Sequence, residues 1–204
     1  MTGENSKNNI LHRRDDMNVY DFDGTIYHGD STRDFAFYLL KHYPKIIKYM
    51  PAFIIAAVRY RLGQISKTKM KETLYRFLNS FKDGEIEKVT KDFWDEHRKN
   101  IYAWYYKKKD ESDVIISASP RFLLEPICRE LKVNLICSEV NKKNGDYIGE
   151  NCFGEEKVGR FRKIYPNAEI NEFYSDSKSD TPLAELSKSA YLVSKSGVIT
   201  TWKW

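Results

Sequence analysis

Five short apolar runs, separated by stretches with helical periodicity, constrain the fold of this chain more than any other feature. Each run ends in polar residues, and the five cover residues 17–21, 114–117, 134–140, 171–175 and 190–194. Apolar runs of this length are typical of parallel strands that are buried on both faces. Strands that alternate with helices form a doubly wound sheet, which binds ligands at the carboxyl ends of its strands. The sequence therefore predicts an α/β fold with a Rossmann-like, mostly parallel core.

The helices between the later runs have recognisable starts. A helix at 121–131 is expected to begin after Ser119 and Pro120, because a serine cap followed by proline at the first helical position is a common start signal. Two further helices are expected at 155–164 and 181–187, where the apolar residues recur at helical spacing.

The region between the first two strands has helical periodicity throughout and a different charge. Residues 31–110 contain 18 Lys/Arg and nine Asp/Glu, whereas the rest of the chain contains 16 and 20. We predict a disordered leader at 1–16, a catalytic core at 17–30 and 113–204, and an inserted all-helical cap at 31–112. The positive charge of the cap has two interpretations. It belongs either to a solvated helical surface or to an electrostatic field that attracts phosphates or acidic lipid headgroups.

Cysteine usage and hydropathy indicate a cytoplasmic protein. Cys128, Cys137 and Cys152 form no Cys-x-x-Cys pair, and the polar start of the chain does not resemble a signal peptide. The most apolar stretch, 51–58, is eight residues long, against the roughly 20 needed for a transmembrane segment. The basic, aromatic-rich stretch around it, 45–61, either contacts a membrane surface or packs over the site. Nucleic acid is not an expected partner, because the aromatic residues follow core spacing.

Two carboxylates follow the first strand in the sequence Asp21-Phe22-Asp23-Gly24-Thr25. Side chains alternate along a strand, so Asp21 and Asp23 point the same way. Like charges this close are unfavourable unless a cation lies between them or one carboxyl keeps its proton. Mg²⁺ beside a transferring phosphoryl group would explain the pair. The alternative is a solvated turn in which Gly24 supplies the bend.

Later polar residues add the other groups that a phosphate site needs. Ser117 ends the second strand and can cradle an anion together with N–H groups at the start of the next helix. Lys157, near the start of a helix, offers a fixed positive charge. Asp176 and Asp180 follow the fourth strand. Each has an ordinary alternative, as a strand-end serine, a solvent-facing lysine or a turn former, but their order along the chain is specific.

In this order the four motifs resemble those of the haloacid dehalogenase superfamily of phosphatases, over residues 17–195. The helical segment between the first two motifs is similar to the cap of the phosphoserine-phosphatase-like branch (subfamily IB). The two-residue turn signal Asn144-Gly145 resembles the same branch. The resemblance implies a phosphoric monoester hydrolase that acts on a small phosphorylated metabolite through an aspartyl-phosphate intermediate, with Mg²⁺ as cofactor.

The resemblance also implies catalytic and metal-binding roles. Asp21 would be the nucleophile, and Asp23 would be the general acid and then the general base. Lys157 would balance the charge between Asp21 and the phosphoryl group. Mg²⁺ would be held by the Asp21 carboxylate, the Asp23 backbone carbonyl, Asp176 and waters that Asp180 steadies.

The same resemblance implies the substrate contacts. Phosphate oxygens would be bound by Ser117, the Ala118 N–H and Thr25. Asp30 lies nine residues after Asp21, at the position where phosphoserine-specific members carry an acid that binds the substrate amine. Asp30 is alternatively the N-cap of the first cap helix.

Two departures argue against strict phosphoserine specificity. Ala118-Ser119 stands where a double glycine is usual, and Ser179 stands where asparagine is common. The cap arginine that would bind an amino-acid carboxylate has only candidates: Arg59, Arg61 and Arg76. The expected substrate is therefore a small organic phosphate, either amine-bearing or, because the cap is basic and rich in aromatic residues, larger or lipid-derived.

Two other functions remain open at this stage. A phosphotransferase or phosphomutase would use the same aspartyl-phosphate. A receiver-like signalling module also combines a strand-end Asp, a hydroxyl residue and a Lys, but such modules are much shorter and lack a long helical insert after the first strand. The sequence predicts no particular oligomeric state.

Overall fold

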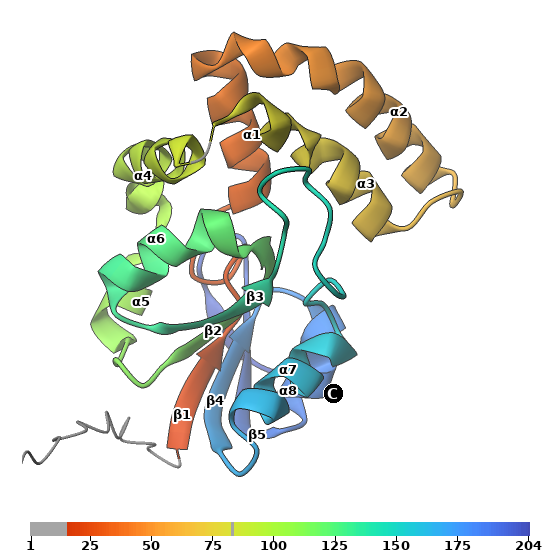
Figure 1. Ribbon diagram of the computed structural model, residues 1–204. Helices are drawn as coiled ribbons and strands as arrows, with labels where there is room; N and C mark the ends of the chain where they lie inside the picture. The colour runs from red at the N-terminus through yellow and green to blue at the C-terminus, as the bar shows by residue number, and fades with distance from the viewer. Residues whose placement is uncertain (1–15, 83) are drawn as a thin grey trace, which may run out of the picture.

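A computed structural model describes residues 16–82 and 84–204 of the chain (Figure 1). Residues 1–15 of the predicted leader lie outside this range. Asp16, the last residue assigned to the leader, instead begins the first strand.

A six-stranded sheet forms the centre of the structure. Its strand order is β3-β2-β1-β4-β5-β6, with the first five strands parallel and β6 antiparallel to β5. The strands are β1 Asp16–Tyr20, β2 Val114–Pro120, β3 Asn134–Ser138, β4 Glu169–Ser175, β5 Ser187–Val193 and β6 Ile199–Thr201. The predicted α/β fold is confirmed. Strand β6 was not predicted, because all three of its residues are exposed and carry no pattern of burial.

Helices cover both faces of the sheet, α5 and α6 on one and α7 and α8 on the other (Figure 1). They are α5 Ala103–Lys108, α6 Arg121–Leu131, α7 Glu155–Ile164 and α8 Thr181–Ala184. Alternate residues of β1 enter the two cores: Val19 packs with Phe161 of α7, and Tyr20 packs with Leu123 of α6. Helices α6 and α7 have their predicted bounds, whereas α8 is shorter than predicted because β5 already begins at Ser187.

The segment between β1 and β2 is helical, as predicted. It contains α1 Ser31–His42, α2 Met50–Arg61, α3 Lys67–Tyr75 and α4 Glu85–His97, with short 3₁₀ turns between them. Phe35 and Phe77 of this segment share one continuous apolar cluster with Tyr20 of the sheet. Tyr105 of α5 lies inside the predicted cap range, yet its ring packs edge-on against Tyr20 at 5.1 Å. The cap boundary therefore stays a prediction, since the apolar core crosses it.

A hairpin loop after β3 rises to meet the cap (Figure 1). Val140 and Tyr147 form an antiparallel bridge, and Gly145 in the turn has φ +82°. A Cβ atom at position 145 would lie 2.5 Å from the backbone carbonyl carbon of Tyr75 at the end of α3. The predicted hairpin is present, and its tip packs against the cap backbone so closely that only glycine fits.

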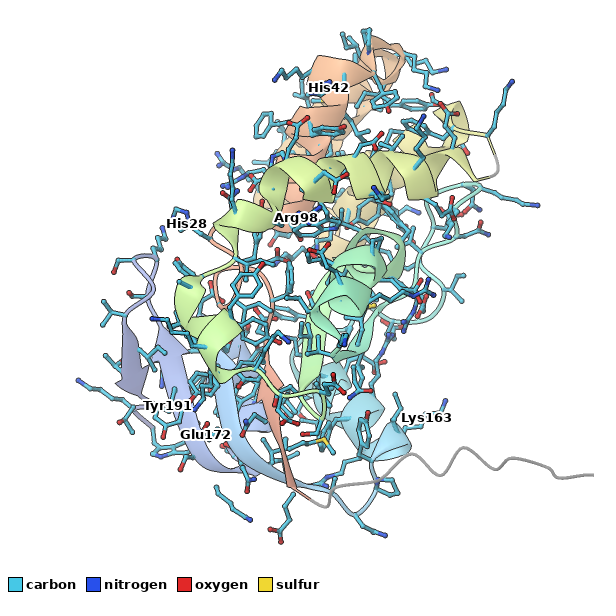
Figure 2. The ribbon with its side chains drawn as sticks, turned by 90° about the vertical axis from the view of Figure 1, so that its left-hand side faces the viewer. His28, His42, Arg98, Lys163, Glu172 and Tyr191 are labelled. Carbon is cyan, nitrogen blue, oxygen red and sulfur yellow. The ribbon has the colours of Figure 1, made fainter. Side chains whose placement is uncertain are left out.

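Ion pairs join the surface of the helices to the sheet and to one another. Lys108 of α5 pairs with Glu172 of β4 at 2.7 Å, and Arg98 pairs with Glu130 of α6 at 2.9 Å. Figure 2 shows Glu172 beside Tyr191 on the sheet and Arg98 farther up, at the end of α4. Exposed pairs of this kind contribute only about 0–1 kcal/mol each, so the apolar clusters carry most of the stability.

Two chain-wide predictions can be compared with the structure. Cys128, Cys137 and Cys152 are free and buried. Within residues 16–82 and 84–204, no helix has both the length and the apolar composition needed to cross a membrane.

Candidate active site

The sheet topology brings the ends of β1, β2 and β4 together. Strand β1 lies between β2 and β4, and the chain winds in opposite directions on its two sides. Ligands bind at such a switch point in doubly wound sheets. A cleft of about 230 Å³ opens there. Of the nine site residues predicted from the sequence, all but Thr25 line this cleft: Asp21, Asp23, Asp30, Ser117, Ala118, Lys157, Asp176 and Asp180.

Lys157 joins two of these carboxylates at the buried end of the cleft. Its Nζ lies 2.7 Å from Asp21 Oδ1 and 2.7 Å from Asp180 Oδ2, and the residue is 2% exposed. Burial opposes the charged form of Lys157, but the two carboxylates outweigh this effect and raise its pKa. Lys157 is therefore a fixed ammonium, placed by the first turn of α7.

Asp180 is bonded on one side only. Its Oδ2 accepts hydrogen bonds from Lys157 and, at 2.8 Å, from the Ser175 hydroxyl. Its Oδ1 is buried and has no hydrogen-bond partner among the described residues. A buried carboxylate oxygen without a partner is unfavourable, so this atom is suited to a water or ligand that completes the site.

The site carries more negative than positive charge at its centre. Burial raises the pKa of Asp21 to about 7, against the opposing effect of the Lys157 ammonium, and the nearby Asp180 charge raises it further. Burial also raises the pKa of Asp176. One ammonium does not neutralise these carboxylates, and a divalent cation would lower the cost of ionising them.

The donor groups suit a hard cation that keeps several waters. In the described part of the chain, no three His, Cys, Asp or Glu side chains already form a complete metal cluster. Mg²⁺ needs only one or two carboxylates beside waters and phosphate oxygens. Asp21 and Asp176, on the same cleft, meet that requirement.

Gly24 makes room for Asp176. Gly24 has φ +75°, which favours glycine. A Cβ atom at position 24 would lie 2.3 Å from Asp176 Oδ2. Thr25 is fully buried, and its hydroxyl accepts a hydrogen bond from the Asp176 N–H at 2.9 Å. Thr25 therefore holds the Asp176 loop in place, and its contact with phosphate stays a prediction.

Asp23 is held by the cap and by β2. Its Oδ1 accepts from the Ser31 N–H at 2.6 Å, and its Oδ2 accepts from the Ser119 hydroxyl at 2.5 Å. Burial raises the pKa of Asp23 to about 6, and the Asp30 charge adds to this, while the two donors oppose it. The expectation that Ser119 caps α6 is wrong: Pro120 is the N-cap, because β2 runs on to Pro120 and directs the Ser119 hydroxyl to Asp23.

The cap contributes lysines instead of the arginines suggested by the sequence. Lys67 and Lys71 of α3 line the cleft, and Lys71 Nζ lies 3.4 Å from the Ala118 carbonyl oxygen. Burial lowers the pKa of Lys71. Of the candidate arginines Arg59, Arg61 and Arg76, none is among the described residues that line the cleft. The sequence signal for the lysines was their i,i+4 spacing, which places both on one helix face.

Asp30 is the N-cap of α1. Its Oδ1 accepts a hydrogen bond from the Arg33 N–H at 2.8 Å, as one of the two interpretations of this residue predicted. Asp30 is also exposed on the wall of the cleft. The N-cap role of Asp30 is thus confirmed. Its contact with a substrate amine stays a prediction.

Proteins of known structure share this fold. A protein of unknown function from Bordetella pertussis Tohama I has a TM-score of 0.69 at 22% identity, over 83% of this chain and 86% of that one. A phosphoserine phosphohydrolase-like protein from Francisella tularensis subsp. tularensis SCHU S4 has a TM-score of 0.51 at 15% identity, over 85% of each chain. At these identities the similarity shows a shared fold.

The sequence comparisons identify the family. Protein CicA of Caulobacter vibrioides (strain NA1000 / CB15N) is 25% identical over 183 residues, which cover 81% of this chain and 80% of that protein. The family model of the haloacid dehalogenase-like hydrolases matches residues 19–185. This match covers most of the chain and includes every residue of the cleft described above. The chain therefore belongs to the haloacid dehalogenase-like hydrolase family.

Proposed function

We propose that this protein is a Mg²⁺-dependent hydrolase of small phosphomonoesters that works through an aspartyl-phosphate on Asp21. One observation carries the proposal: Lys157 lies 2.7 Å from both Asp21 and Asp180 at the buried end of a cleft that Asp23 also lines. A buried nucleophile, a fixed ammonium and a second carboxylate with a raised pKa are the groups that phosphoryl transfer needs.

The first half-reaction transfers the phosphoryl group to Asp21. Lys157 binds Oδ1 of Asp21, so Oδ2 is the oxygen free to attack phosphorus. As the bond from Oδ2 to phosphorus forms, the bond from phosphorus to the leaving oxygen breaks. Asp23 donates its proton to that oxygen, and its raised pKa favours the protonated form that this step requires.

The second half-reaction returns the site to its starting state. Asp23, now ionised, accepts a proton from a water whose oxygen attacks phosphorus. The bond from phosphorus to Asp21 Oδ2 breaks, which frees the Asp21 carboxylate and releases inorganic phosphate. Ser119 suits both states of Asp23, because a hydroxyl can donate to a carboxylate and accept from a carboxylic acid. The Ser117 hydroxyl oxygen accepts from the Ser119 N–H, so its proton is available for a phosphate oxygen.

The cation site would use oxygen atoms from three residues. Mg²⁺ would be held by the carboxylates of Asp21 and Asp176 and by the backbone carbonyl of Asp23, and Asp180 would steady a bound water. When bound, the cation supplies positive charge that favours the approach of a phosphate dianion to an ionised Asp21.

Metal removal gives the first test. We expect hydrolysis of p-nitrophenyl phosphate with Mg²⁺, loss of turnover in EDTA, and recovery when Mg²⁺ is added in excess. Asp176→Asn should raise the Mg²⁺ concentration for half-maximal activity at least about tenfold, because a charged ligand is lost. Asp92→Asn, on α4, should match the wild type. Turnover that is unaffected by EDTA would contradict the proposal.

The cap lysines give a second prediction. Lys71→Gln should raise KM for a dianionic phosphomonoester at least about tenfold, with kcat within about twofold, because a partly buried charge contact is worth about 1.5–3 kcal/mol. Lys69 lies on the same helix but is exposed and pairs with Glu72. Lys69→Gln is therefore the matched control, and steady-state kinetics measures KM for both variants. An equal change of KM in the two variants would mean that Lys71 does not contact the substrate.

Ser119 gives a third prediction, on pH dependence. Its hydrogen bond favours the ionised form of Asp23, so Ser119→Ala should raise the pKa of Asp23 by about one unit. Because Asp23 must be protonated to act as an acid, kcat/KM for an alkyl phosphate falls above this pKa. The alkaline limb of the pH profile should therefore move upward in the variant. If the alkaline limb stays at the same pH in the variant, the Ser119 hydroxyl does not influence the pKa of the general acid.

A further inference from the structure

The outer face of α2 is apolar and unpartnered by the described residues. Helix α2 buries only Ala56 fully. Ile54, Ile55, Val58 and Leu62, just after the helix, are 57%, 61%, 52% and 66% exposed. Their spacing places these four side chains on one side of the helix, and we call them the α2 face. Figure 1 shows α2 at the end of the molecule opposite the sheet.

Basic side chains border the α2 face. At 100° per residue, Arg59 and Arg61 lie on opposite sides of it. Neither arginine forms an ion pair with another described residue. The surrounding segment, residues 35–71, contains eight Lys/Arg and no Asp/Glu. An exposed apolar strip with cationic borders is complementary to a surface whose outer groups are negatively charged and whose interior is apolar.

We propose that α2 docks on the surface of an anionic lipid bilayer, with the α2 face in the boundary between headgroups and acyl chains. An interfacial helix of this kind has an apolar side flanked by Lys and Arg. Twelve residues make a helix of about 18 Å, which lies along a membrane. A second copy of the chain fits less well, because pairing two α2 faces would bring their arginines together without an acidic partner.

Docking would place the cleft beside the membrane. After Leu62 only four residues separate the α2 face from Lys67, which lines the cleft. The docking proposal does not depend on the proposed catalytic activity, and it is tested without measuring turnover.

Vesicle sedimentation of the full chain gives the test. The probes are vesicles of pure phosphatidylcholine and vesicles in which part of it is replaced by phosphatidylglycerol. We expect binding to the anionic vesicles, weaker binding to the neutral ones, and release by salt. Arg59→Gln/Arg61→Gln should lower the partition coefficient roughly 30-fold, and Lys88→Gln/Lys99→Gln removes the same charge elsewhere as the control.

A second pair of variants tests the apolar part. Ile54→Ser/Ile55→Ser should lower binding at least about tenfold, whereas Ile148→Ser/Val198→Ser, at equally exposed positions outside the cap, should not. Circular dichroism checks that each variant is folded. The proposal is overturned if the wild type stays in the supernatant with anionic vesicles at low salt, or if α2 and control variants bind alike. A wild-type dimer that the α2 variants dissociate would also overturn it, because a second copy would then cover the face.

Discussion

Asp21→Asn is expected to lower kcat for phosphomonoesters by at least about 10⁴-fold, because an amide cannot attack phosphorus and losses of this size follow removal of a nucleophile. KM should change much less, since the cleft keeps Lys157, Lys71 and Ser117. Steady-state kinetics with highly purified protein measures the effect. Retention of more than a few per cent of the activity would mean that another group attacks.

Asp21→Asn should remain folded, because the ionised Asp21 carboxylate lowers the stability of the folded state. The pKa of Asp21 rises from 3.8 to about 7 on folding, because burial outweighs the opposing Lys157 charge. The folded state therefore binds more protons, and ionisation of Asp21 lowers stability as pH rises from about 4 through 7. Asp21→Asn should remove this part of the slope in the metal-free protein. Urea denaturation at several pH values measures it.

Lys157→Met is expected to abolish activity and to destabilise the protein by about 3–5 kcal/mol near pH 8. The substitution leaves Asp21 and Asp180 buried without a counter-charge, and breaking a buried ion pair from one side has a cost of this size. Lys163 is the matched control, because it lies on the same helix but is exposed, as Figure 2 shows. Lys163→Met should change stability by less than about 0.5 kcal/mol.

A double variant separates charge from packing. Asp180→Asn in the Lys157→Met background removes one of the uncompensated carboxylates, so it should recover part of the lost stability but none of the activity. Denaturant unfolding of the four proteins gives the coupling free energy between the two residues. If the two single changes were simply additive, the 2.7 Å contact would have no energetic role.

The sequence was most informative where burial acts locally. Helices α6 and α7 have the expected bounds because apolar periodicity and turn residues mark both ends. Strand β6 was missed because its side chains are exposed and its pairing with β5 depends on the finished sheet. The gathering of polar groups in the cleft followed from parallel topology, since the carboxyl ends of such strands share one edge.

Individual side-chain roles near the cleft were harder to predict, because they depend on contacts between distant segments. Ser119 resembles a helix cap in the sequence, but the extension of β2 turns its hydroxyl to Asp23, which lies 96 positions earlier. The hydrogen bond from the Asp176 N–H to the Thr25 hydroxyl joins residues 151 positions apart and was not predicted. The i,i+4 spacing puts Lys67 and Lys71 on one helix face, but Lys71 reaches the cleft because α3 folds over the end of β2, which the spacing alone does not encode.

Identification of the phosphorylated residue tests the central claim most directly. The protein should be mixed with substrate and Mg²⁺, quenched in acid and digested, and its peptides analysed by mass spectrometry. We predict that one phosphoryl group appears on Asp21 and is absent in Asp21→Asn. A phosphoryl group on Ser117, Ser119 or another hydroxyl residue of the cleft, or turnover with no phosphorylated enzyme at all, would contradict catalysis through an aspartyl-phosphate.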